Sequence, residues 1–486
     1  MIEHLREDKR TRMRQPGLAA LAILLTVGVC DAHPTSQVLM GMRLESAHET
    51  KGAITLITSG AKFLIRPNGL LTGWQRIPRV RKVLDVKLPA SILPCHLRNN
   101  DDFSAAVACQ GGSLEFHGDS VIILKIEQTQ EVGLQGWFKP AYHFEKEGKG
   151  LLIDAKGGFG VYPVAKKNTS PPELSRLPWN LTYKLSAGEE VWLSVFPPRP
   201  YNWRRAFESL DHEMGNLPSD DASRGKMDEL IASTAKHCKV FALHAGIWRD
   251  TPEEFKAKTG MYAGQPQPWM TDRHVPADLN EFFRVREEAH RNGMKLVVYL
   301  SPYYSKAPDI VGEMKRVLAE YQVDGLYFDG ISLDFRKSYR IIRQARQLLG
   351  DDRILYVHCS EDPLLDPRIY CPFIDTYADY ILRGEAGRRR LPLETFLRWT
   401  ISGYNISNAV GYWCYYGSNK ESQSGDPSEY LDQVPNVQHV DAALRNEARI
   451  WRQGESWSLP RLKNDLTRFD EYYFRKLAKL RNKKLP

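Results

Sequence analysis

The sequence lacks the cysteine spacing of a structural zinc site. Its 7 cysteines include no Cys-x-x-Cys pair and no Cys/His cluster with zinc spacing, although structural zinc sites are usually built from such short spacings. The glycine-rich phosphate-binding motifs of P-loop and dinucleotide-binding proteins are also missing from the start of every expected helix. We therefore expect neither a nucleotide nor a metal, and no cofactor of any other kind.

A basic-aromatic motif of the kind that binds nucleic acid is also absent. The formal net charge is +8 over 486 residues, and part of it falls in the C-terminal stretch RKLAKLRNKKLP. Elsewhere acidic and basic residues alternate along the chain. Because no aromatic residues accompany the basic ones in a recognisable pattern, we interpret the excess as solvated surface and expect no nucleic-acid partner.

Beyond its first 30 residues the chain has no apolar run long enough to cross a bilayer. The N-terminus does carry a shorter run. A net-basic stretch, EDKRTRMRQPG, is followed by LAALAILLTVGV and then by CDAHP. This order predicts a signal peptide over residues 1–32, with Ala32 as the last residue before cleavage. We expect a secreted or periplasmic protein, and favour this over an uncleaved anchor because the run is short.

Two cysteine pairs flank short loops and are consistent with an oxidising compartment. Cys95 and Cys109 enclose a polar segment that a hairpin could close, and Cys359 and Cys371 enclose another. Either pair is a candidate disulfide, but spacing alone does not fix which cysteines are bonded.

The chain changes character near residue 200. Over residues 33–188, short β-branched segments such as GAITLIT and SVIILKIEQ are separated by Gly, Pro and Asn. This pattern predicts strands and turns, and we expect a β-sandwich domain.

Over residues 189–458, helical periods alternate with short apolar runs, which is typical of parallel strands covered by helices. Counting VWLSVF as the first, we find about seven such strands, and this number favours a closed (β/α)8 barrel of the TIM type over an open sheet. Residues 459–486 predict a basic helix that closes or flanks the barrel.

Polar and aromatic residues gather at the ends of these expected barrel strands. The C-terminal ends of barrel strands carry the active site in this fold class, so their side chains should share one face. The residues concerned are His244, Trp248, Tyr303, Asp329, His358, Glu361, Asp362, Arg383, Glu385, Trp413 and Tyr415.

Carboxylates, histidines and aromatics together suit a sugar site. Glycosidases commonly use two carboxyl groups, one to protonate the leaving oxygen and one to attack the sugar or activate water. We predict Asp329 as nucleophile or transition-state stabiliser and Glu385 as general acid/base. Glu361 and Asp362 remain alternatives to Glu385. The other residues of the set are predicted to bind an oligosaccharide or polysaccharide substrate.

Each residue also has a purely structural interpretation. An acid after a parallel strand can cap the next helix or pair with an arginine, His244 and His358 can be core histidines, and Trp248 and Trp413 can be packing residues. Asp324, at the start of the strand that ends in Asp329, is interpreted as a turn or cap residue. A metal-dependent hydrolase built on the two histidines and Asp329 is disfavoured, since no HxH or HxxxH spacing is present.

The segments VFPPRP, VDGLYFDGISLDFRKSYRIIRQAR, LYVHCS, YCPFIDTYADYILRGEAG and ISGYNISNAVGYW resemble the barrel of glycoside hydrolase family 123-like proteins over about residues 190–420. That resemblance implies an N-terminal β-sandwich followed by a (β/α)8 barrel. More distantly, YQVDGLYFDG is similar to the nucleophile strand of retaining α-L-fucosidases, which implies that Asp329 attacks the sugar.

The resemblance to family 123 breaks at the catalytic pair. Characterised members are β-N-acetylgalactosaminidases with adjacent Asp and Glu, and they use the acetamido group of the substrate as nucleophile. Here Gly330 follows Asp329. The sequence therefore keeps two interpretations open: a secreted glycosidase of another specificity, and a non-catalytic carbohydrate-binding barrel that has lost the pair.

Overall fold

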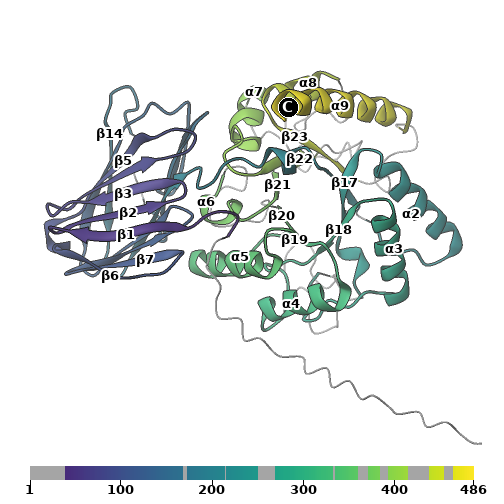
Figure 1. The fold of residues 1–486 in the computed structure, drawn as a ribbon, viewed down its shortest axis with the longest axis horizontal. Helices are drawn as coiled ribbons and strands as arrows, with labels where there is room; N and C mark the ends of the chain where they lie inside the picture. Colours follow the sequence, from purple (N-terminus) through teal and green to yellow (C-terminus); the bar gives the residue numbers. More distant parts are fainter. Residues whose placement is uncertain are drawn as a thin grey trace, which may run out of the picture. The chain divides into compact units, whose positions relative to one another are not determined.

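The computed structural model describes residues 39–167, 172–213, 215–249, 269–331, 334–358, 370–383, 392–413, 437–453 and 463–485 (Figure 1). The expected signal peptide lies outside these residues. Within them, no helix combines the length and apolar character needed to cross a membrane.

The first part of the chain forms two antiparallel sheets (Figure 1). The seven-stranded sheet has the order β1 (Leu44–Thr50), β2 (Ala53–Thr58), β3 (Ala61–Ile65), β4 (Leu70–Gln75), β5 (Arg81–Lys87), β10 (Gln130–Gly136) and β14 (Trp179–Leu185). The eight-stranded sheet has the order β11 (Tyr142–Lys146), β12 (Lys149–Asp154), β13 (Gly157–Pro163), β15 (Glu190–Phe196), β9 (Val121–Ile126), β8 (Gly112–His117), β7 (Ser104–Cys109) and β6 (Cys95–Asn100).

The two sheets share one apolar core. In β14 buried and exposed residues alternate without exception, as expected for a strand with one face in the core. Phe63 from one sheet packs on Phe116 from the other, with ring centroids 5.4 Å apart. The sequence therefore predicts this part correctly, because a period of two is the signature of a half-buried strand.

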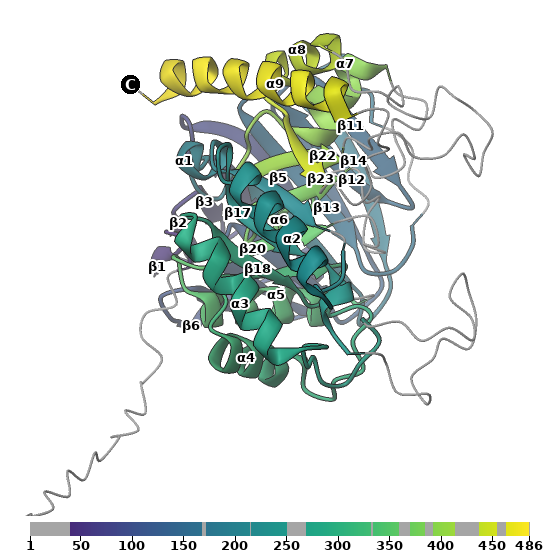
Figure 2. The same cartoon turned by 90° about the vertical axis from the view of Figure 1, so that its right-hand side faces the viewer.

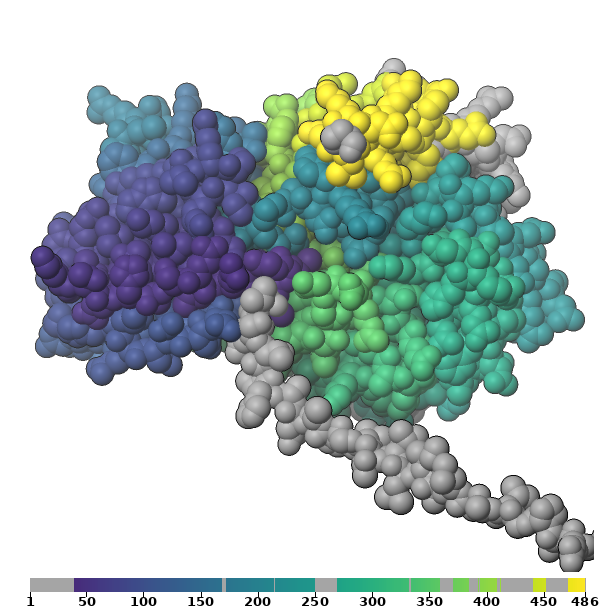
Figure 3. Space-filling view, in the orientation of Figure 1, coloured from purple at the N-terminus to yellow at the C-terminus, as the bar shows by residue number. Residues whose placement is uncertain are grey.

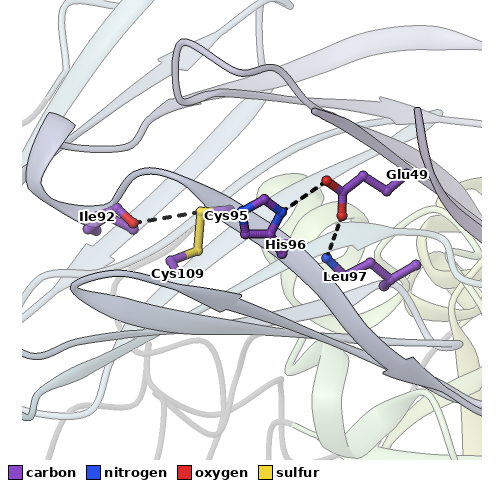
Figure 4. Close-up of a disulfide and its surroundings, with 6 residues drawn as sticks. All are labelled: Glu49, Ile92, Cys95, His96, Leu97 and Cys109. Atoms are coloured by element: carbon purple, nitrogen blue, oxygen red, sulfur yellow. Dashed lines mark hydrogen bonds and ion pairs between the residues drawn. A yellow bond between two sulfur atoms is a disulfide. The ribbon is translucent and has the colours of Figure 1, made fainter. Parts of the chain in front are cut away.

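A disulfide joins Cys95 on β6 to Cys109 on β7 (Figure 4), which confirms the first of the two predicted pairs. Cys359 lies outside the described residues, so the second pair stays a prediction. Beside the disulfide, the Glu49 carboxylate on β1 accepts a hydrogen bond from the Leu97 amide at 3.0 Å and lies 3.1 Å from His96 Nδ1 (Figure 4). These contacts link the edges of the two sheets.

The second part of the chain is a closed ring of parallel strands. In ring order these are β16 (Ser209–Glu213), β17 (Cys238–Leu243), β18 (Lys295–Tyr299), β19 (Gly325–Asp329), β20 (Ile354–His358), β21 (Tyr380–Arg383), β22 (Ala409–Trp413) and β23 (Arg449–Gln453). Pairing of β16 with β23 closes the ring. The chain is thus a multidomain protein with β and α/β parts, as expected.

Helices follow the ring strands, and α2, α3 and α4 cover their outer face (Figures 1 and 2). The helices are α1 (Trp203–Ala206), α2 (Asp221–Thr234), α3 (Leu279–Arg291), α4 (Ile310–Tyr321), α5 (Phe335–Leu349), α6 (Pro372–Asp375), α7 (Leu393–Thr395), α8 (Val437–Arg445) and α9 (Lys463–Lys484). A π-helical turn, Phe396–Ile401, continues α7.

Four of these helices begin in the same way. The aspartate side chains that precede them accept a hydrogen bond from a backbone amide in the first turn, which satisfies a donor that has no partner within the helix. These N-cap residues are Asp220, Asp278, Asp309 and Asp334.

One expected barrel strand belongs to the sandwich. VWLSVF is β15, which pairs antiparallel with β13 and β9, so taking it as the first barrel strand is wrong and the ring begins at β16. Both faces of β15 are buried: Leu193 lies in the sandwich core, whereas Trp192 packs on Phe335 of α5. A strand buried on both faces has the continuous apolar run of a parallel strand, which is why the sequence of β15 resembles that of a barrel strand.

The C-terminal residues form the helix α9, drawn in yellow at the surface in Figure 3. Its Tyr473 hydroxyl accepts a hydrogen bond from the Ile450 amide of β23, and its Tyr472 hydroxyl donates to Asp441 of α8. These bonds fix the helix to the end of the ring.

Aromatic side chains fill the ring interior below its C-terminal end. The Trp451 indole lies between Tyr356 and Tyr380, with centroid distances of 5.2 and 5.6 Å. Gly411 makes room for this indole, because a Cβ atom there would lie 2.4 Å from it. The ring is therefore a packed core rather than a channel at this level.

Near the start of α4, a buried carboxylate ties this helix to the loop that precedes α3. Glu313 accepts hydrogen bonds from the Arg316 guanidinium at 2.7 and 2.8 Å and from the His274 amide at 2.6 Å. Burial raises the pKa of Glu313, but the bonds from Arg316 and His274 outweigh it and lower the pKa to about 2.

We expect Gly411→Ala to lower stability by about 1–3 kcal/mol, because an added methyl group overpacks the core against an indole held on both sides. Gly225→Ala is the matched control. Gly225 is exposed within α2 and a Cβ atom there meets nothing, so alanine should raise helix stability by up to about 1 kcal/mol. Thermal unfolding of both variants tests the packing, and an unchanged melting temperature for Gly411→Ala would contradict it.

We expect Glu313→Gln to reduce stability at pH 7 by about 1–3 kcal/mol, since hydrogen bonds to a charged group are lost. The folded pKa of Glu313 is depressed, so its contribution is complete above its ordinary value of 4.5 and disappears as the pH falls towards about 2. Chemical denaturation between pH 7 and pH 2 should show the variant converging on the wild type. Glu320→Gln, at an exposed carboxylate of the same helix, should show a smaller deficit at pH 7, and equal deficits would contradict the assignment.

Candidate functional site

Asp329 ends strand β19 at the C-terminal end of the ring, which we call the barrel mouth. The Tyr299 hydroxyl of β18 donates a hydrogen bond to its Oδ2 atom at 3.3 Å. On the other side, Nδ1 of His358 lies 3.2 Å from its Oδ1 atom. Asp329 keeps 18% of its side chain exposed, so the carboxylate is held by neighbouring strands and still reaches solvent.

Strand register places these groups together. Asp329 pairs with His358 across β19 and β20, and two residues earlier Tyr327 pairs with Tyr356. Because residues two apart share a face of a strand, each aromatic lies one layer below its polar neighbour. The rings of Tyr327 and Tyr356 stack with centroids 4.4 Å apart, and they form a floor beneath Asp329.

Three histidines gather at the barrel mouth. The His212 ring lies 5.4 Å from that of His244, and its Nδ1 atom is 3.2 Å from the Tyr356 hydroxyl. The Tyr327 hydroxyl lies 3.2 Å from Nδ1 of His358. Burial, followed by the neighbouring His244 and His358, lowers the pKa of His212 well below its ordinary value. His212 is therefore a neutral ring at pH 7, able to donate one hydrogen bond and accept another.

Tyr299 is a proton donor rather than a charged group. Burial raises the pKa of its hydroxyl well above the ordinary value, and the Asp329 carboxylate raises it further. Its O–H therefore stays intact at neutral pH and points at the carboxylate. With the Tyr299 hydroxyl on one side of the Asp329 carboxylate, a ligand would meet this side chain from its solvent-exposed side.

The structure does not bring Trp248 to the barrel mouth. Trp248 is 2% exposed, and its indole N–H donates to the Tyr299 carbonyl at 3.0 Å. Its ring packs on Phe282 of α3 and Tyr321 of α4. This is the packing role that the sequence left open.

Arg383 also faces away from the barrel mouth. It forms a fully buried ion pair with Asp375 of α6 and donates to the Thr400 carbonyl. Strand alternation explains the position: Leu382 pairs with His358 and Gly411 in the register of the interior face, so the next residue points outward.

The remaining predicted residues are placed only in part. Tyr303 follows β18, is partly buried, and packs on Tyr304 with centroids 4.7 Å apart. Trp413 ends β22 at the mouth, where only its backbone is described. Glu361, Asp362, Glu385 and Tyr415 lie outside the described residues.

The sequence missed several residues of the site. Tyr327 and Tyr356 lie two residues before the strand ends Asp329 and His358, and Tyr299 is itself the last residue of β18, so all three could have been found by reading the strand ends. His212 was hidden because SLDHE, with four charged or polar side chains, does not look like a buried strand. Trp269, whose ring lies 6.2 Å from that of His244, had no signal beyond its aromatic character.

Asp324 lies at the opposite end of β19, as expected. Its carboxylate accepts the Leu296 amide at 2.8 Å and contacts His290 Nε2 at 2.7 Å. These contacts fix the start of β19.

Among the residues with described positions, no group of three or more His, Cys, Asp or Glu side chains is arranged to hold a metal ion.

Comparison with known proteins gives only distant likenesses. No protein-family model matches the chain, and no curated protein matches it. Among solved structures, the GH36 alpha-galactosidase AgaA from Geobacillus stearothermophilus is similar with a TM-score of 0.41 and 8% identity, over 91% of this chain and 73% of that one. The GH31 dextranase FjDex31A from Flavobacterium johnsoniae gives a TM-score of 0.40 and 9% identity, over 90% of this chain and 60% of that one.

The alpha-galactosidase TtGalA from Thermus thermophilus gives a TM-score of 0.36 and 11% identity, over 89% of this chain and 93% of that one. These likenesses are too distant to assign an activity or a substrate to this chain.

Proposed function

We propose that the protein hydrolyses a glycosidic bond at the barrel mouth, with Asp329 as nucleophile or transition-state stabiliser. The observation that carries the proposal is a single one: the Asp329 carboxylate is held between the Tyr299 hydroxyl and His358, above a closed aromatic floor. A carboxylate fixed in this way can stabilise or attack an oxocarbenium-like centre.

The surrounding groups suit a sugar. Sugar hydroxyls both donate and accept hydrogen bonds, and so does an imidazole ring. His244 is partly exposed at the mouth, with Trp269 at its edge and the buried His212 ring beside it. The tyrosine layer beneath limits how deep a ligand can enter, so a ring bound here would rest with its reacting carbon at the level of Asp329.

The second carboxyl group of the proposed pair is Glu385. It follows the last residue of β21, Arg383, by two positions, and β21 is separated from β19 by one strand of the ring. Its place in the sequence, directly after a ring strand, is what supports it as the acid of the pair, since active sites of such barrels lie at the C-terminal ends of the strands. Glu361 and Asp362 remain the alternative acids.

The proposed substrate is an oligosaccharide or polysaccharide outside the cytoplasm. Export rests on the sequence of residues 1–32, with its basic stretch and short apolar run. The disulfide between Cys95 and Cys109 supports an oxidising compartment.

The backbone at Gly330 bears on the family 123 mechanism. Its φ is +77°, in the left-handed region that glycine tolerates and glutamate rarely adopts. The adjacent Asp-Glu pair of that family would be strained at this position. Acetamido-assisted hydrolysis is therefore not part of the proposal. The same observation favours the second candidate, a carbohydrate-binding barrel that does not cleave.

A screen of aryl glycosides with the wild type and Asp329→Asn tests the assignment. The variant keeps the side-chain size and removes the charge, so we expect the rate on any cleaved glycoside to fall at least about a hundredfold. The rate of release of the aryl group is the measurement.

Asp324→Asn is the matched control, because it makes the same change at the other end of the same strand. It should retain activity wherever circular dichroism shows it folded. Activity that survives in Asp329→Asn would refute the assignment. No cleavage by the wild type, together with oligosaccharide binding, would establish the non-catalytic alternative.

A further inference from the structure

A second pocket lies where the eight-stranded sheet meets helix α5. It has a volume of about 410 Å³, within the range of small-ligand sites. Strand residues His117, Glu115 and Trp192 form one wall, and α5 forms the other. The pocket is separate from Asp329 and from every residue of the barrel mouth.

The α5 wall is one face of the helix. Its lining residues recur at intervals of three and four, which places them in a row along the helix. They are Arg336, Tyr339, Arg340, Arg343, Gln344 and Gln347. Three arginines and one glutamate, Glu115, line the pocket, and the carboxylate of Glu190 pairs with Arg336.

The base of the pocket is held rigidly. The buried Asp119 carboxylate accepts the Tyr339 hydroxyl at 2.9 Å and the Tyr377 hydroxyl at 2.7 Å. The Glu190 carboxylate accepts both Nε and Nη2 of Arg336, at 3.0 and 2.8 Å. A site with a fixed wall loses little side-chain entropy when a ligand binds.

A buried histidine, His117, lines this pocket and is 7% exposed. Its Nε2 atom faces the Glu115 carboxylate at 3.7 Å, and this contact lowers the pKa of Glu115. Its Nδ1 atom has no hydrogen-bond partner in the described structure. Buried polar groups are nearly always hydrogen-bonded in proteins, so this imidazole points to a ligand that the pocket receives.

Further donors on α5 are available to the same ligand. Arg340 and Gln347 are exposed and Gln344 is partly exposed. Guanidinium and amide N–H groups match the paired oxygens of a carboxylate or sulfate.

The aromatic residues of the pocket do not offer open faces. Trp192 is fully buried and packs edge-to-face on Tyr339, with centroids 5.4 Å apart. The His117 ring packs edge-to-face on the same tyrosine at 5.3 Å. Stacking of a neutral sugar or a nucleobase is therefore not what this pocket provides.

We propose that this pocket binds a small ligand through a carboxylate or sulfate group, with Arg340 and His117 as its contacts. The ligand is either a free inorganic anion or an acidic saccharide such as a uronate. This site does not depend on the function proposed for the barrel mouth.

Isothermal titration of the full chain with sodium sulfate, D-glucuronate and neutral D-glucose tests the proposal. We expect saturable binding of sulfate, glucuronate or both by the wild type, and none of glucose. Arg340→Gln and His117→Phe should each weaken binding at least tenfold. Arg340→Gln changes an exposed helix residue and should fold. His117→Phe removes the ring nitrogens but keeps an aromatic ring in the same place.

Two control variants make the result specific. Lys337→Gln removes the same charge from an exposed position of α5 outside the lining, and Asp329→Asn alters only the barrel mouth. Both should bind within twofold of the wild type.

Binding of sulfate alone identifies the free anion as the ligand, and binding of glucuronate identifies the acidic sugar. Absence of binding by the wild type, equal binding of glucose, or an equal loss in Lys337→Gln would overturn the proposal. Loss of binding in Asp329→Asn would move the ligand to the barrel mouth. Failure of glycoside cleavage with anion binding intact would refute only the proposed hydrolase.

Discussion

The pairing of β19 with β20 places the central carboxylate of the candidate site beside its histidine and above its aromatic floor. This register sets Asp329 beside His358 and Tyr327 beside Tyr356. A shift by one residue would turn the carboxylate outward and an apolar side chain inward, because neighbours along a strand face opposite sides. The aromatic layer fills the ring and the polar layer above it is exposed at the mouth, so the same register accounts for both the core and the chemistry.

Much of this arrangement was predictable. Switches between helical period and short apolar runs predict the strands that end in Asp329 and His358 and the helix between them. The disulfide of Cys95 and Cys109 was one of two candidate pairs that flank short loops, and the structure was needed to establish it. Asp324 was correctly separated from Asp329, because a strand of five residues places its two ends on opposite faces of a barrel.

What escaped prediction depends on tertiary contacts. Trp248 and Arg383 both follow strands, yet one packs under helices and the other pairs with a buried aspartate. A sequence position at or after the end of a strand does not show whether the side chain faces the interior or the exterior of the barrel. β15 shows the same limit from the other direction, since burial by two different cores gave it the composition of a barrel strand. His212 sits on a strand whose charged residues concealed it.

The structure of the protein bound to a hydrolysis-resistant, thio-linked oligosaccharide would test the central claim most directly. The account predicts a sugar at the barrel mouth with its anomeric carbon about 3–3.5 Å from an Asp329 carboxylate oxygen, and with a hydroxyl group on His244. A sugar bound elsewhere, with the Asp329 carboxylate still engaged only by Tyr299 and His358, would contradict it.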